Sequence, residues 1–215
     1  MTAIGVLVDG LRADPLLEPR KTREYLDMMA SETSRLRRLI DSFLTFAQLD
    51  RGRQQFTLAP VQPSWLVETA VDAIRDRLPA DYQLDLDMAP GLPMVIADAD
   101  ALNTALVNLL ENAMKYTTDD KRITVRASVD GGEFVRFDVT DNGIGIPAGE
   151  QRRIFRRFYR VDQWLSRETA GVGLGLSIVE LVMRAHGGSV AVRSTPGAGS
   201  TFTLRVPCVR HGQTA

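Results

Sequence analysis

The sequence predicts an α+β fold, in which a helical hairpin precedes a two-layer α/β sandwich whose mixed sheet has helices on one face. Apolar residues recur at helical spacing over the first fifty positions. After them, strand-like and helical stretches alternate, and the turn signals "DGG" and "TPGAG" each separate two strand-like runs. We therefore expect a hairpin over residues 1–52 and a sandwich domain over residues 56–208.

Two apolar stripes predict the hairpin. In the opening "MTAIGVLVDGL" a stripe begins at Ile4, although no capping residue precedes it. A second helix is expected from about Lys21 to Asp50, after "RADPLLEPR", whose two prolines suit a turn. The stripe of this second helix comprises Tyr25, Met29, Leu36, Ile40, Phe43 and Ala47. Since a hairpin alone buries little, either a homodimeric four-helix bundle or packing on the neighbouring domain would cover it.

Short runs predict the elements of the sandwich in order. Strands are expected at "FTLAPV", "YQLDLDM", "PMVIAD", "RITVRASV", "EFVRFDVT", "SVAVRS" and "STFTLRVP". Helices are expected from Ser64 to Arg77, from about Asp98 to Tyr116, and over "LGLSIVELVMRAH". The last four strands form two hairpins, closed by "DGG" and "TPGAG".

Composition limits the class of protein. The chain is 44% hydrophobic and 25% charged with a net charge of −1, which is typical of a globular protein without general attraction to nucleic acid. One cysteine, Cys208, and two histidines, His186 and His211, give no disulfide and no pattern of a metal centre. No apolar run has the length of a membrane span, and the start lacks the features of a signal peptide. We expect a cytoplasmic protein, attached to a membrane only through segments upstream of this sequence.

The segment "NLLENAMKY" carries a polar row on one helix face. Asn108, Asn112, Lys115 and Tyr116 share this face, because they follow one another at helical spacing. The opposite stripe is apolar and can be core: Leu102, Leu106, Leu109 and Ala113. The row offers an amide oxygen for a metal ion, a cation for phosphate and a ring for stacking. An ordinary amphipathic helix explains the same pattern.

The segment "DNGIGIP" places a carboxylate at the end of an apolar strand. Asp141 can accept a hydrogen bond from an exocyclic amine, which adenine has where guanine has a carbonyl. Gly143 and Gly145 let the backbone approach a flat ligand closely. The alternative is a simple turn that ends the strand.

The segment "AGVGLGLSIVE" leads a glycine-rich stretch into a helix. The free amides of a helix start form an anion site, which Gly171, Gly173 and Gly175 would leave open. It is not a dinucleotide fingerprint, because Leu176 stands where a third glycine belongs. A glycine-rich hinge is the alternative.

In this order the three segments resemble the N, G1 and G2 boxes of the ATP-binding domain of sensor histidine kinases, which has the Bergerat fold. Between the last two, "IFRRFYRVD" resembles the F box of that family, and "HGGSVAVRSTPGAGSTFTLRVP" resembles its closing hairpin. The first helices resemble the second half of its dimerisation and phosphotransfer domain. The resemblance covers about residues 2–206.

The resemblance implies roles for the residues of the polar row. Asn112 would hold the Mg²⁺ that bridges the phosphates of ATP, and Asn108 would support that site. Lys115 would reach a phosphate, and Tyr116 would line the adenine pocket.

The other boxes complete the implied site. Asp141 would bind the adenine amine, with Gly143 and Gly145 giving the base room. Arg160 of the F box would lie near the γ-phosphate, while the other arginines of that segment form a solvated or partner-facing surface. The remaining cofactor contacts would come from Gly171, Gly173, Leu174 and Gly175.

The implied activity is transfer of the γ-phosphoryl group to a histidine, for relay to the aspartate of a response regulator. In this family the phosphorylated histidine belongs to a run such as H-E-L-R-T-P-L-T-A-I, of which "MTAI" matches only the end. His186 lies in a "HGG" that is structural in the family. We therefore expect no autophosphorylation of this chain alone. The alternatives are an ATPase of the gyrase, Hsp90 and MutL kind, or a dimerising regulatory module that only binds ATP.

Overall fold

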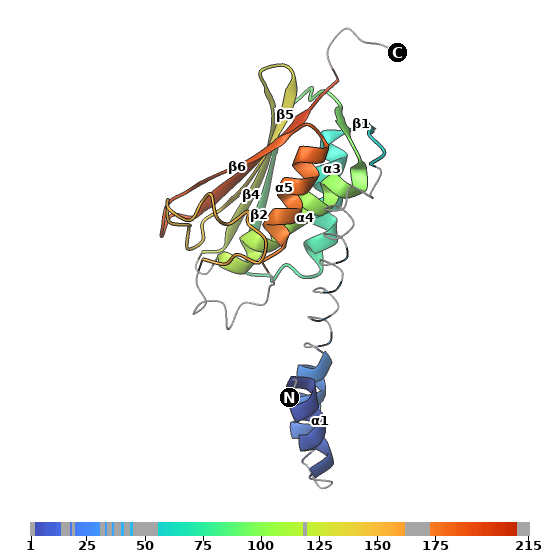
Figure 1. Ribbon diagram of the computed structural model, residues 1–215, viewed down its shortest axis with the longest axis vertical. Helices are drawn as coiled ribbons and strands as arrows, with labels where there is room; N and C mark the ends of the chain where they lie inside the picture. The colour runs from blue at the N-terminus through green and yellow to red at the C-terminus, as the bar shows by residue number, and fades with distance from the viewer. Residues whose placement is uncertain are drawn as a thin grey trace. The chain divides into compact units, whose positions relative to one another are not determined.

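The protein is described by a computed structural model, which covers residues 3–13, 18, 20–30, 33, 36, 40, 44, 56–117, 120–161 and 173–209 (Figure 1). The chain forms two compact units, residues 1–45 and 46–215. None of the helices in these residues has the length and apolar composition needed to cross a bilayer.

The described residues of the first unit include two continuous helical segments. α1 spans Ala3–Ala13, and residues 20–30 are also helical. The two segments touch, because a Cβ added to Gly10 would lie 2.9 Å from the ring of Tyr25. Farther along, Leu36 and Ile40 of the predicted second stripe are exposed, at 43% and 57%. Phe43 and Ala47 of that stripe lie outside the described residues.

The second unit is built on a mixed five-stranded sheet in the order β2-β4-β5-β7-β6. β2 runs parallel to β4, and every other neighbouring pair is antiparallel. The strands are β2 (Gln83–Met88), β4 (Arg122–Asp130), β5 (Phe134–Asp141), β6 (Ser189–Ser194) and β7 (Ser200–Pro207). The two expected hairpins are present as β4–β5 and β6–β7.

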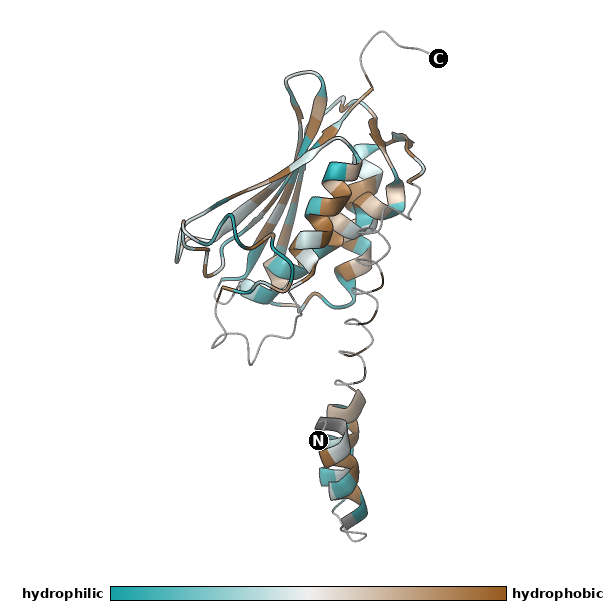
Figure 2. Cartoon of the chain, viewed as in Figure 1, coloured by the Kyte–Doolittle hydropathy of each residue, from teal (hydrophilic) through white to brown (hydrophobic). Residues whose placement is uncertain are grey.

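Three helices cover one face of this sheet, as expected (Figure 1). They are α3 (Pro63–Arg75), α4 (Ala99–Tyr116) and α5 (Gly175–Ala185), and α4 packs between the other two. Figure 2 shows hydrophobic residues along these helices and along the strands of the sheet. The core includes Leu106 and Phe137, which are at most 1% exposed. Burial of this apolar area is the main force that holds the layers together.

The expected strands "FTLAPV" and "PMVIAD" do not join the main sheet. They form a separate antiparallel pair, β1 (Ala59–Val61) with β3 (Val95–Ala97). The first run begins its strand only at Ala59, because the backbone N–H of Thr57 donates instead to the Asp98 carboxylate at 2.9 Å. Asp98 also caps α4 by accepting from the N–H of Ala101 at 3.0 Å, which fixes where this helix begins.

Candidate nucleotide-binding site

α4 presents its polar row on the side away from the core. The predicted core stripe of this helix is buried, and each of its residues is at most 3% exposed: Leu102, Leu106, Leu109 and Ala113. Asn108, Asn112, Lys115 and Tyr116 are all partly exposed. The helix thus separates an apolar face from a polar one, as its spacing predicted.

The side chains of the row differ in what they contact. The Asn108 Nδ2 donates to the Thr104 carbonyl oxygen at 2.8 Å, one helical turn back. The Lys115 Nζ lies over the ring of Tyr116, 4.8 Å from its centroid. A cation over an aromatic face is held by the ring's electrostatic field and stays available to a phosphate.

Asp141 ends β5 as a buried carboxylate, with 7% of the residue exposed. The backbone N–H of Gly143 donates to its Oδ1 at 2.9 Å, and the backbone of Ser200 donates a second hydrogen bond to the carboxylate. Burial raises the pKa of Asp141 above its ordinary value, and these two hydrogen bonds oppose that shift. The backbone therefore fixes the direction of the carboxylate, which leaves acceptor sites for a ligand.

Gly143 brings the loop after β5 against the end of α4. A Cβ at Gly143 would lie 2.3 Å from the carbonyl oxygen of Tyr116, closer than real atoms allow. The next residue, Ile144, donates its N–H to the same oxygen at 3.1 Å. The two predicted segments "NLLENAMKY" and "DNGIGIP" are thus joined through one carbonyl group.

Gly145 likewise allows a close backbone approach, here between the loop and Thr195. Its φ is +70°, and a Cβ there would lie 2.0 Å from the carbonyl oxygen of Thr195. Only glycine adopts this backbone conformation freely at such a close approach.

The third predicted segment reaches α4 through Gly175. A Cβ at Gly175, the first residue of α5, would lie 2.7 Å from the Asn108 Oδ1. Gly173 adopts a φ of +75°, and its carbonyl oxygen accepts the N–H of Phe158 at 2.9 Å. The side chain of Leu174 is 2% exposed in the core, so this residue can offer a ligand only its backbone. Gly171 lies outside the described residues.

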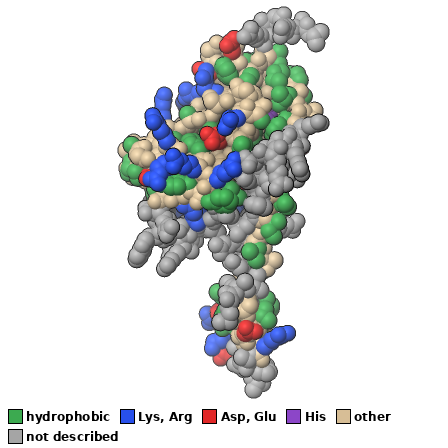
Figure 3. All heavy atoms as spheres, viewed as in Figure 1, with side chains coloured by type: hydrophobic (Ala, Val, Ile, Leu, Met, Phe, Trp, Pro, Cys, Tyr) green, Lys and Arg blue, Asp and Glu red, His purple; other side chains and the backbone are tan. Residues whose placement is uncertain are grey.

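Arg160 lies beside the start of α5. It is partly exposed in the stretch 158–161, and the carbonyl oxygen of its neighbour Tyr159 would be 2.8 Å from a Cβ on Gly173. Four arginines that precede this stretch are exposed: Arg152, Arg153, Arg156 and Arg157. Figure 3 shows exposed Lys and Arg side chains gathered on one face of this unit.

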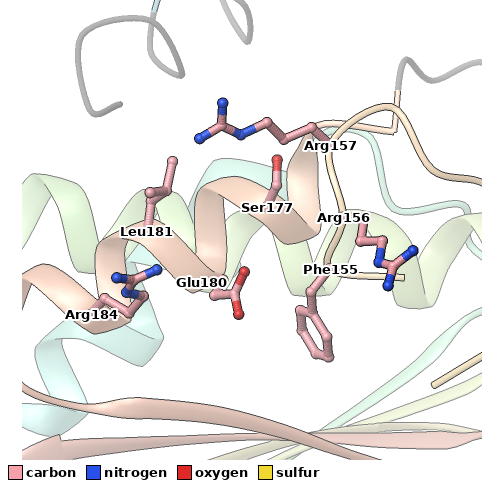
Figure 4. Close-up of a pocket in the computed structure, with 7 residues that line it drawn as sticks. All are labelled: Phe155, Arg156, Arg157, Ser177, Glu180, Leu181 and Arg184. Atoms are coloured by element: carbon pink, nitrogen blue, oxygen red, sulfur yellow. The ribbon is translucent and has the colours of Figure 1, made fainter. Parts of the chain in front are cut away.

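A pocket of about 340 Å³ opens beside these arginines, on the outer side of α5 (Figure 4). It contains none of the residues predicted to bind the nucleotide. Its lining residues are Phe155, Arg156, Arg157, Ser177, Glu180, Leu181 and Arg184.

His186 is a buried structural residue, as the family resemblance implied. Its Nε2 accepts the backbone N–H of Asp98 at 2.9 Å, and its Nδ1 lies 2.7 Å from the carbonyl oxygen of Val182. Because Nε2 accepts a hydrogen bond, Nδ1 is the nitrogen that can donate to this carbonyl oxygen. Phe56 packs edge-on against it at 5.2 Å between centroids.

Comparison with known proteins assigns the chain to a protein family. The sequence profile of the histidine kinase-, DNA gyrase B- and HSP90-like ATPases matches residues 97–210, from the end of β3 to just beyond β7. The chain belongs to this family. The histidine kinase-like ATPase domain therefore includes α4, the loop after β5, and α5, and it binds ATP.

Relatives place the domain among those of sensor histidine kinases. The sensor-like histidine kinase SenX3 of Mycolicibacterium smegmatis is 36% identical over 207 residues, which cover 95% of this chain and 53% of SenX3. The probable sensor histidine kinase TcrY of Mycobacterium tuberculosis is 40% identical over 192 residues, 88% of this chain and 39% of TcrY. The chain thus spans about half or less of the length of these relatives.

Solved structures share the fold. Full-length ShkA in complex with AMPPNP superposes with a TM-score of 0.75 at 27% identity, covering 97% of this chain and 44% of ShkA. The histidine kinase ThkA, solved in complex with response regulator protein TrrA, gives a TM-score of 0.75 at 20% identity, covering 96% of this chain and 57% of ThkA. The predicted fold class is confirmed by these likenesses.

Sequence reasoning missed the contribution of the turn between β6 and β7 to this ATPase domain. The backbone of Ser200 donates to Asp141, and a Cβ on Gly199 would lie 1.9 Å from the Asp141 carbonyl oxygen. The sequence signal was the pair of glycines in "GAG", which predicted only a turn. In the structure both glycines have positive φ.

Proposed function

We propose that the chain is the catalytic module of a sensor histidine kinase, which transfers the γ-phosphoryl group of ATP to a histidine for relay to a response regulator. The observation that carries the proposal is the meeting of three segments around α4. Ile144 and Gly143 pack on the carbonyl oxygen of Tyr116, and Gly175 packs on Asn108. This meeting supports the proposal that adenine and the phosphates are bound by segments that converge on one helix.

In this proposal Asp141 reads the base. Its carboxylate, held by two backbone hydrogen bonds, accepts from the exocyclic amine of adenine. Guanine presents a carbonyl oxygen at that position, which would face the carboxylate without a proton between them. Tyr116 borders the base. The ammonium group of Lys115 lies over the Tyr116 ring, and in this proposal it turns from there toward the phosphates.

Asn112 is our proposed ligand for Mg²⁺. Its amide oxygen is a hard donor of the kind that Mg²⁺ prefers, and the side chain is partly exposed. Among the described residues, no three His, Cys, Asp or Glu side chains gather into a metal site. The ion would therefore depend on Asn112 and on the oxygens of the phosphates, whose charge it would neutralise.

The acids near the polar row favour a kinase over a hydrolytic enzyme. A side-chain amide cannot remove a proton from water, so Asn108 is no general base. Glu111, one turn farther along α4, is paired with Arg77 at 2.5 Å. We therefore expect slow ATP hydrolysis, which separates this proposal from the gyrase, Hsp90 and MutL kind of ATPase.

Two partners complete the proposal. A second copy of the chain would cover the exposed side chains of the helical unit, among them Leu36 and Ile40. A response regulator would receive the phosphoryl group on an aspartate, in keeping with the ThkA complex. We place the protein in the cytoplasm, with any membrane attachment upstream of this sequence.

The proposal is tested by supplying a phosphoacceptor. A version of the chain with "HELRTPL" placed directly before Thr2 carries the phosphoacceptor run that the family resemblance implies. Incubated with γ-labelled ATP and Mg²⁺, this version should acquire acid-labile label, and the same version with glutamine in place of the added histidine should not.

The unextended chain should stay unlabelled, because both nitrogens of His186 are already hydrogen-bonded in the interior. A histidine-bearing version that binds ATP yet acquires no label would contradict the kinase proposal. Label that maps to His186 in the unextended chain would instead contradict the structural role of that residue.

A further inference from the structure

In the loop after β5, the backbone N–H and carbonyl groups of both Ile144 and Ile146 form hydrogen bonds. Ile144 donates its N–H to Tyr116 and accepts the N–H of Gly197 on its carbonyl oxygen at 2.8 Å. Ile146 donates its N–H to the Ser194 Oγ at 2.7 Å. The carbonyl oxygen of Ile146 accepts from the Gln151 Nε2 at 3.1 Å. The loop at residues 142–146, which we call the glycine loop, is thus fixed from outside itself.

Ser194 lies at the centre of these contacts. Its hydroxyl accepts from Ile146 and donates to the carbonyl oxygen of Gly199 at 2.8 Å. It also lies 3.0 Å from the hydroxyl of Ser200. One side chain therefore ties the glycine loop to the turn between β6 and β7, and its bond to Ile146 spans forty-eight residues of sequence.

Gln151 forms the second tie between the same two segments. Its Nε2 donates to the carbonyl oxygens of both Ile146 and Ser194, the latter at 2.8 Å. Both protons of the amide group are thus used, and the side chain is partly buried. Removing it would leave one carbonyl oxygen of each segment without this donor.

The turn that these side chains hold is also the turn that orients the adenine-reading carboxylate. Ser200 donates to the Asp141 carboxylate, and Gly199 packs directly on the Asp141 backbone. A shift of the turn relative to the glycine loop would therefore change the direction of the Asp141 side chain. Neither Ser194 nor Gln151 need touch the nucleotide for this effect.

We propose that Ser194 and Gln151 are positioning residues for adenine recognition, which clamp the glycine loop and the β6–β7 turn on either side of Asp141. The inference rests on the proposed role of Asp141 as the reader of adenine. Loss of either clamp leaves the core intact and loosens the geometry of the carboxylate. Affinity for ATP and discrimination against GTP should then fall together.

The experiment is calorimetric titration of the full chain with ATP and with GTP in the presence of Mg²⁺. The test variants are Ser194→Ala and Gln151→Leu, which each remove the hydrogen-bonding group while keeping much of the volume. Ser194→Thr keeps the hydroxyl and serves as the conservative rescue. Ser189→Ala is the matched control, because this serine is exposed at the far end of the same strand.

We expect Ser194→Ala and Gln151→Leu each to weaken ATP binding about tenfold and to narrow the ratio of ATP to GTP affinity. Ser194→Thr and Ser189→Ala should match the unaltered chain. Thermal unfolding of each nucleotide-free variant is measured alongside. A cooperative transition near that of the unaltered chain shows that lost affinity reflects the site and not unfolding.

An affinity and a ratio unchanged in both test variants would overturn the inference. An equal loss of ATP and GTP affinity, with the ratio kept, would also overturn it, because it indicates general loosening. The proposed function fails separately, in the unaltered chain, if ATP shows no advantage over GTP there.

Discussion

Asn108 and Gly175 lie in direct contact. A Cβ added to Gly175 would lie 2.7 Å from the Asn108 Oδ1. The contact joins the middle of α4 to the first residue of α5. Gly175→Ala should therefore push aside the side chain of Asn108, the residue that the family resemblance assigns to support of the Mg²⁺ site. Because the displaced atom is the end of a movable side chain, the cost in stability should be small, about 1 kcal/mol or less.

The measurement is ATP affinity by calorimetry and the free energy of unfolding by denaturant titration. We expect several-fold weaker ATP binding with nearly unchanged stability. Gly149→Ala is the control, since a Cβ there meets no atom within 4 Å. If Gly175→Ala bound ATP as tightly as the control, the contact would have no part in the site.

Asn112→Ala should remove the proposed protein ligand to Mg²⁺. ATP binding measured with Mg²⁺ should weaken about tenfold, and binding measured in EDTA should change little, because only the metal-dependent part is lost. Asn112→Asp keeps an oxygen donor and should retain metal-dependent binding. An equal loss with and without Mg²⁺ would show that Asn112 acts on the nucleotide by another route.

The helical unit should make the chain a homodimer. Leu36 and Ile40 are 43% and 57% exposed, and burial of such side chains against a second copy gains free energy. Light scattering should show a dimer, and the double variant Leu36→Glu, Ile40→Glu should be monomeric with unchanged ATP binding. A strictly monomeric unaltered chain at high concentration would refute the dimer.

The elements with a strong local pattern were predictable, and the contacts between them were not. Leu102 to Ala113 repeat at helical spacing, and "DGG" stands between two alternating runs, so α4 and the β4–β5 hairpin followed from the sequence. The separate pairing of β1 with β3 did not, because short apolar runs carry no information about which strand they pair with.

The same division holds for the site. Asp141 and its glycines could be proposed as site residues because a carboxylate followed by G-x-G is a local signal. Ser194 and Gln151 were not, since their partners lie in segments far from them in sequence. The buried contacts of His186 with Asp98 are long-range as well, and only the family resemblance indicated a structural role.

Asp141 should oppose the stability of the nucleotide-free protein at neutral pH. Burial raises its pKa in the folded state, so the folded protein binds this proton more tightly than the unfolded chain. The favourable contribution of the protonated group is present below the unfolded pKa and is lost as the pH rises through the folded pKa.

Asp141→Asn removes this ionisation. The melting temperature of the variant minus that of the unaltered chain should therefore increase as the pH rises through the pKa of Asp141 in the folded protein. Paired thermal melts across the acid range measure the difference. A difference that does not change with pH would show that ionisation of Asp141 is not linked to folding.

The most direct test of the account is whether Asp141 makes the site selective for adenine. Calorimetry with ATP, ADP and GTP in Mg²⁺ should show ATP and ADP bound at least about tenfold more tightly than GTP, the value of one charge-assisted hydrogen bond. Asp141→Asn should reduce that preference while the protein still unfolds cooperatively. Equal affinity of the unaltered chain for ATP and GTP would contradict the account.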